Sequence, residues 1–108
     1  MLKIIKNMKD LDFQRLMEVY AESVALNGKE FYPDLEPSLQ ILREEESFYA
    51  FLRIFFQRPD AFYAVNEEDG KYVSALRLES FNDGLLLEAL ETAPEYRQKG
   101  FGKELVRQ

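Results

Sequence analysis

The segment Glu91–Leu105, with the sequence ETAPEYRQKGFGKEL, contains the residues of this chain that are best suited to bind a phosphate group. Pro94 follows an apolar run and cannot donate to a strand ladder, so a strand is expected to end just before it. A helix is then expected to begin near Gly100. Backbone N–H groups at a helix N-terminus lack intrahelical acceptors and bind anions, and Gly100 and Gly102 allow close approach.

Four basic side chains accompany these glycines and could hold the anion: Arg97, Lys99, Lys103 and Arg107. Arg97 could instead brace the loop. The other three also fit a solvated helix face, and the glycines also fit a tight strand-to-helix turn without a ligand. The run lacks the third glycine of the dinucleotide-binding fingerprint and the Gly-Lys-Ser/Thr of a P-loop.

The composition limits the chemistry that the chain could perform. Cysteine and histidine are both absent from the 108 residues, which excludes disulfides, thiol nucleophiles, imidazole bases and most transition-metal sites, so no metal is expected. The formal net charge of -6 disfavours a sequence-independent nucleic-acid binder. No stretch approaches the roughly 20 apolar residues that span a bilayer, and the N-terminus has too short an apolar run for a signal peptide. A cytoplasmic protein without nucleic-acid or membrane partners is therefore expected.

The N-terminal half predicts one strand and two helices. The apolar, β-branched run Leu2–Lys6 favours a strand. From Asp10, apolar residues recur at helical spacing, with Asp10 as a cap and Asn27-Gly28 as a C-terminal stop. A second helix is expected from Pro37 to about Gln57. Most of the aromatic residues of this region are expected to be core, namely Phe31, Tyr32, Phe48, Phe51 and Phe55.

The following sequence predicts three antiparallel strands, at AFYAV, YVSALRLESF and LLLEALETA. Asp69-Gly70 between the first two is a tight-turn signal, and Asn82-Asp83-Gly84 separates the second from the third. The expected order is strand, two helices, a three-stranded meander and the start of a third helix. This is a mixed α/β (α+β) domain.

The stretch TAPEYRQKGFGKELV closely resembles motif A of the GNAT-type N-acetyltransferases, whose acetyl-CoA loop reads Arg/Gln-x-x-Gly-x-Gly/Ala. The resemblance implies the acyl-CoA N-acyltransferase-like fold and transfer of an acetyl group from acetyl-CoA, as co-substrate, to an amine by direct attack. It implies that the fourth strand offers backbone groups to the pantetheine arm, at Leu90, Glu91 and Thr92. It also implies that loop amides hold the pyrophosphate, with Arg97 nearby and Lys103 just inside the helix, at Gln98, Lys99, Gly100, Phe101 and Gly102.

Amine acetylation needs a base that takes a proton from the attacking ammonium, and strand carboxylates are the candidates. Glu88 and Glu91 are the first candidates, and Glu79 is a third. Strand charges are also commonly solvated or paired, so this alternative stays open for each. Tyr32 and Tyr63 could line a pocket for the acceptor or belong to the core.

Members of that family continue past this helix into another strand, a fourth helix and a terminal hairpin, and a tyrosine used as general acid comes later. The chain is therefore expected to be a single partial domain, residues 1–108, that is inactive alone. It is expected either to pair in a homodimer through an exposed sheet edge or the C-terminal helix, or to stay a monomer with a frayed C-terminus. The alternative is a non-catalytic half-domain for CoA binding or protein interaction. The acceptor, a small-molecule or peptide amine, is not identified by these residues.

Overall fold

The computed structural model describes residues 1–81 and 84–94. They form four strands, one short 3₁₀ helix and three α-helices in an order that agrees with the predicted mixed α/β class. The elements are, in chain order, β1 (Leu2–Ile5), η1 (Met8–Asp10), α1 (Phe13–Val19), α2 (Ala21–Phe31), α3 (Pro37–Phe55), β2 (Phe62–Glu68), β3 (Lys71–Phe81) and β4 (Gly84–Thr92).

The four strands form one antiparallel sheet in the order β1-β2-β3-β4. The β2–β3 connection is the tight turn that the sequence predicts, with positive φ at both Asp69 (51°) and Gly70 (76°), as a type I′ hairpin requires. Directly paired residues on neighbouring strands share a face, so Tyr63, Arg77 and Glu88 form one row across β2, β3 and β4.

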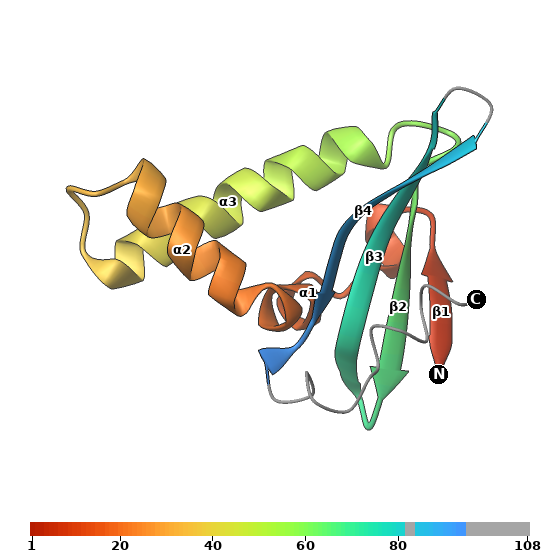
Figure 1. Ribbon diagram of the computed structural model, residues 1–108, viewed down its shortest axis with the longest axis horizontal. Helices are drawn as coiled ribbons and strands as arrows, with labels where there is room; N and C mark the ends of the chain where they lie inside the picture. Colours follow the sequence, from red (N-terminus) through yellow and green to blue (C-terminus); the bar gives the residue numbers. More distant parts are fainter. Residues whose placement is uncertain (82–83, 95–108) are drawn as a thin grey trace.

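The helices lie on one face of this sheet (Figure 1), and the main core fills the space between them. Leu16 and Leu52 contribute from the helices, and Tyr63 and Val65 contribute from the sheet, all of them fully buried. A second, smaller cluster lies on the other face and comprises Ala64, Leu76 and Leu78, with Leu2 and Phe62 packed against it. Among the described residues, no helix is long and apolar enough to cross a membrane.

The prediction of one helix from Asp10 to Gly28 is wrong at both ends and in the middle. Asp10 ends the 3₁₀ helix, and the side chain that caps α1 belongs to Asp12, whose Oδ1 accepts from the Arg15 N–H at 3.1 Å. The helical path breaks at Tyr20, which connects α1 to α2 with φ -93° and ψ 14°. The helix then continues through Gly28 to Phe31.

Gly28 does not end α2 because it serves the contact between two helices. A Cβ built at this position would lie 2.6 Å from the backbone oxygen of Gln40, on α3, which is closer than real Cβ contacts. The glycine therefore lets the α2 and α3 backbones approach one another.

We expect Gly28→Ala to destabilise the domain, although alanine has the higher helix propensity. The clash with Gln40 costs about 1–3 kcal/mol in the free energy of unfolding, and this outweighs a propensity gain of about 1 kcal/mol. Urea denaturation measures the difference, with Ala25→Leu as a control because Ala25 is exposed on the same helix. A Gly28→Ala variant that is more stable than the wild type would contradict the close approach.

Helix α3 begins at Pro37 as predicted and ends at Phe55, two residues before the predicted Gln57. Figure 1 shows that the α2–α3 pair extends beyond the sheet, so only the C-terminal part of α3 covers it. Leu52 and Phe55 are the residues of α3 that are fully buried. The expectation that Phe31 and Phe51 are core is therefore wrong, since they are 62% and 42% exposed.

Candidate functional site

Strand β4 forms an edge of the described sheet and contains a bulge. Arg77 pairs with Glu88 and Ala75 pairs with Glu91, so two residues of β4, Ala89 and Leu90, lie opposite one residue of β3. Ala89 has φ 54°, in the left-handed region. A bulge of this kind increases the local twist and changes the direction of neighbouring groups, and bulges are common beside active sites.

One hydrogen bond fixes the direction of the backbone at the end of this strand. The Ala93 N–H donates to the Val73 carbonyl, on β3, at 2.7 Å. Backbone groups of successive residues in a regular strand point to alternate sides, so those of Thr92 point away from β3. The backbone of Glu91 points toward β3 by the same alternation.

Glu88 lies just before the bulge and pairs with an arginine. Arg77 Nη2 is 3.5 Å from Glu88 Oε2. The guanidinium of Arg77 also lies over the rings of Phe51, at 4.5 Å from the centroid, and Phe55, at 5.8 Å. Arg77 Nε is buried and has no hydrogen-bond partner within residues 1–81 and 84–94. The cation–π contacts and the ion pair together fix Arg77 between α3 and β4.

Glu91 and Glu79 also have partners in the structure. Ser23 Oγ, on α2, donates to Glu91 Oε1 at 3.1 Å. Arg58 pairs with Glu79. Each of the three candidate bases is therefore half-buried on the sheet and bonded to a neighbouring side chain. Their role as bases stays a prediction.

A small pocket lies beside Glu88 on the helical side of the sheet. Its volume is about 210 Å³, and its lining residues are Phe51, Ile54, Phe55, Arg58, Glu79 and Glu88. Aromatic and aliphatic walls with a few charged groups are typical of sites for small molecules. Tyr63 is not among the lining residues and is fully buried. Of the two alternatives predicted for it, a pocket wall or the core, the structure therefore shows the core.

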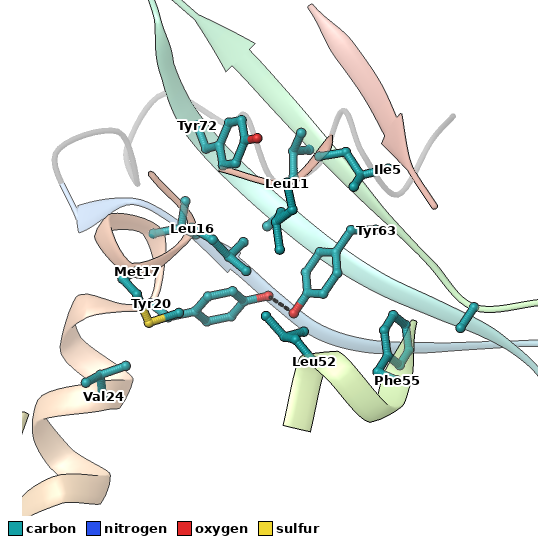
Figure 2. Packing of buried hydrophobic residues seen from close by; sticks show 14 residues of the cluster. Ile5, Leu11, Leu16, Met17, Tyr20, Val24, Leu52, Phe55, Tyr63 and Tyr72 are labelled. Atoms are coloured by element: carbon teal, nitrogen blue, oxygen red, sulfur yellow. Dashed lines mark hydrogen bonds between the residues drawn. The ribbon is translucent and has the colours of Figure 1, made fainter. Parts of the chain in front are cut away.

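Two buried tyrosines meet beneath the bulge, in a contact that the sequence did not predict. Tyr20 Oη lies 2.5 Å from the Ala89 carbonyl oxygen and 3.4 Å from Tyr63 Oη. Figure 2 shows the two hydroxyls pointing toward one another. Burial, followed by the nearby Tyr63, raises the pKa of Tyr20 well above its usual value. Burial also raises the pKa of Tyr63, while the hydrogen bond with Tyr20 and the charge of Arg77 oppose this increase.

Several predicted cofactor-binding residues lie outside the described residues, namely Arg97, Gln98, Lys99, Gly100, Phe101, Gly102 and Lys103. Their role stays a prediction from the sequence. The described chain reaches Pro94, so the predicted loop begins directly after the strand that carries the bulge. The predicted homodimer also stays a prediction. Among the described residues, no group of three or more acidic side chains is placed to hold a metal ion.

A family model described as the Acetyltransferase (GNAT) family matches residues 28–108, three quarters of the chain. The chain belongs to this family. The resemblance of the glycine-rich segment to motif A is thereby confirmed at the level of the family. No curated protein sequence matches the chain.

Solved structures of GNAT acetyltransferases share the fold of this chain. PaiA N-acetyltransferase from Thermoplasma acidophilum, in complex with coenzyme A, matches with a TM-score of 0.64 and 21% identity, over 99% of this chain and 68% of that chain. A GNAT family acetyltransferase from Staphylococcus aureus matches with a TM-score of 0.58 and 15% identity, over 96% of this chain and 82% of that chain. An acetyltransferase from Vibrio fischeri matches with a TM-score of 0.54 and 14% identity, over 99% of this chain and 80% of that chain. The predicted acyl-CoA N-acyltransferase-like fold is confirmed.

Proposed function

We propose that this protein transfers an acetyl group from acetyl-CoA to the amino group of a small molecule or peptide. The observation that carries the proposal is the bulged edge strand β4, which leads directly into the predicted phosphate-binding segment. Membership of the acetyltransferase family supports it, and so does the coenzyme A in the similar T. acidophilum structure.

The backbone of β4 is suited to hold the pantetheine arm. We propose that the arm lies along Leu90, Glu91 and Thr92, on the side of β4 away from β3, as an added strand would. We propose that the segment from Arg97 to Lys103 holds the pyrophosphate through backbone N–H groups and positive side chains. The donor would then lie along β4 with its thioester near the bulge.

The reaction requires that the amine nitrogen bond to the acetyl carbon while the carbon–sulfur bond breaks. The amine loses a proton and the sulfur leaves as the CoA thiol. We propose Glu91 as the group that receives or relays this proton, because it directly follows the bulge of β4, near the proposed position of the thioester. No covalent enzyme intermediate is required, which suits a chain without cysteine.

Thermal unfolding with CoA or acetyl-CoA tests the proposed donor site. A ligand that binds only the folded state raises the melting temperature, and a concentration about 100 times the Kd adds about 2.7 kcal/mol. We expect this increase in the wild type and its loss in a Gly100→Val, Gly102→Val double variant, because the added Cβ atoms would block the approach of the pyrophosphate. The control is Gly84→Val, which makes one such replacement at an exposed glycine of β4.

The possible outcomes separate the enzyme from its alternative. No increase in the melting temperature with millimolar CoA would reject the donor site. Mass spectrometry would detect acetylation of a panel of primary amines. If CoA binds but no amine is acetylated, the result favours the non-catalytic CoA-binding module. Acetylated product would identify the class of acceptor directly.

A further inference from the structure

The backbone at Ala89 has a geometry that its residue type does not favour. Its φ of 54° lies in the left-handed region, which residues with a Cβ rarely adopt. Such a conformation persists only where the surrounding structure holds it in place, and it is common at functional sites. The contacts around Ala89 show which group holds it.

The Ala89 carbonyl is held by the hydroxyl of Tyr20. The two oxygens are 2.5 Å apart, and because a carbonyl oxygen can only accept, Tyr20 is the donor. Tyr63 Oη, at 3.4 Å, can then donate its own proton to Tyr20. The two tyrosines are 3% and 0% exposed, so water does not compete for these bonds.

Tyr20 is itself fixed in position. Its N–H donates to the Leu16 carbonyl at 3.2 Å, and its own carbonyl accepts from the Val24 N–H at 2.8 Å. Its ring packs against Phe48 of α3, with the centroids 5.2 Å apart. The break between α1 and α2 therefore places one side chain, rigidly, beneath the bulge of β4.

This hydrogen bond determines the direction of a second group. The Ala89 carbonyl and the Leu90 N–H belong to the same peptide unit, which is planar and trans, so they point in opposite directions. When Tyr20 holds the carbonyl, the Leu90 N–H must point away from the tyrosine pair. Leu90 is 42% exposed as a residue, and it lies on β4, an edge strand of the described sheet.

We propose that Tyr20 is a positioning residue of the acetyl-transfer site, which holds the Ala89–Leu90 peptide so that the Leu90 N–H donates to the thioester carbonyl of the bound donor. This inference rests on the proposed function. Donors that are fixed toward the oxygen on which charge develops are a major source of rate acceleration in acyl transfer. A peptide that could rotate would lose this orientation.

The test is the carbonyl stretching frequency of acetyl-CoA bound to the protein, measured by infrared difference spectroscopy with ¹²C- and ¹³C-labelled acetyl groups. In the wild type we expect a frequency below that of free acetyl-CoA, because the Leu90 N–H polarises the carbonyl. In Tyr20→Phe we expect the frequency to return toward the free value, with an affinity for CoA that changes by less than about threefold.

The matched control is Tyr72→Phe. Tyr72 is also buried, at 2% exposure, and its hydroxyl accepts from the Asp12 N–H at 3.0 Å, so this variant loses a comparable hydrogen bond away from the bulge. Its carbonyl frequency should equal that of the wild type. The inference would be overturned if the wild type and Tyr20→Phe had equal carbonyl frequencies. It would also be overturned if Tyr20→Phe and Tyr72→Phe shifted this frequency by the same amount.

A second measurement uses the wild type alone, so it applies even if Tyr20→Phe does not fold. Acetyl-CoA should move the Leu90 amide proton resonance downfield more than CoA does, because CoA lacks the acetyl carbonyl. Equal shifts with both ligands would overturn the inference while leaving the donor site intact. The absence of binding by either ligand would instead reject the proposed function.

Discussion

Leu52→Ala should lower the free energy of unfolding by about 2–5 kcal/mol, because it removes a fully buried side chain and leaves a cavity. Leu52 and Phe55 are the fully buried residues through which α3 joins the core. Small domains have a total stability of only about 5–15 kcal/mol. The variant should therefore lose a large part of its stability, and Tm should fall by about 4–8 °C for each kcal/mol lost.

The control for this prediction is Ile54→Ala, two residues away on the same helix. Ile54 has a side chain of the same size but is 67% exposed. Its truncation should change stability by much less than that of Leu52, because little apolar surface returns to water. Equal losses in the two variants, measured by urea denaturation, would show that α3 is not attached through Leu52 as described.

The strands could be predicted from the sequence because their signals are local. Alternating apolar residues and the Asp69-Gly70 turn determine β2 and β3, and the observed φ values at both turn positions are those that the residue types favour. Pro37 at the start of α3 is a similar local signal. Each of these features depends on residues that are close together in the chain.

The features that the sequence did not predict depend on tertiary contacts. Gly28 has the residue type of a helix stop, but here it permits the close approach of Gln40 from another helix. The exposure of Phe31 and Phe51 follows from how far the α2–α3 pair extends beyond the sheet, which hydrophobic spacing does not encode.

The candidate site was likewise predictable only in part. Glu88 and Glu91 could be placed on the last strand from the apolar pattern around them. The bulge between them had no glycine to mark it, since its left-handed residue is Ala89. A hydroxyl from Tyr20, 69 positions earlier in the chain, bonds to this residue. A distant side chain of this kind leaves no local pattern in the strand.

The buried tyrosine pair should make the protein lose stability at alkaline pH. Burial raises the pKa of Tyr20 well above its usual value and also raises the pKa of Tyr63, whereas in the unfolded chain both phenols ionise near pH 10. Above about pH 10 the unfolded state therefore releases protons that the folded state retains. The stability is fully present below this pH, and it is lost as the pH rises toward the pKa values of the folded state.

The expected slope is large because two groups contribute. Each tyrosine that stays protonated in the folded state and ionises in the unfolded state lowers stability by up to about 1.4 kcal/mol per pH unit, and the pair by up to about 2.7 kcal/mol per unit. Urea denaturation at a series of values from about pH 9 to 11.5 measures this slope.

Tyr20→Phe and Tyr63→Phe should each remove about half of this pH dependence of stability. Tyr49→Phe is the control because Tyr49 is 43% exposed, and its slope should match that of the wild type. A wild-type slope that neither buried variant reduces would mean that the tyrosine pair does not cause the alkaline loss and that water reaches the hydroxyls beneath the bulge.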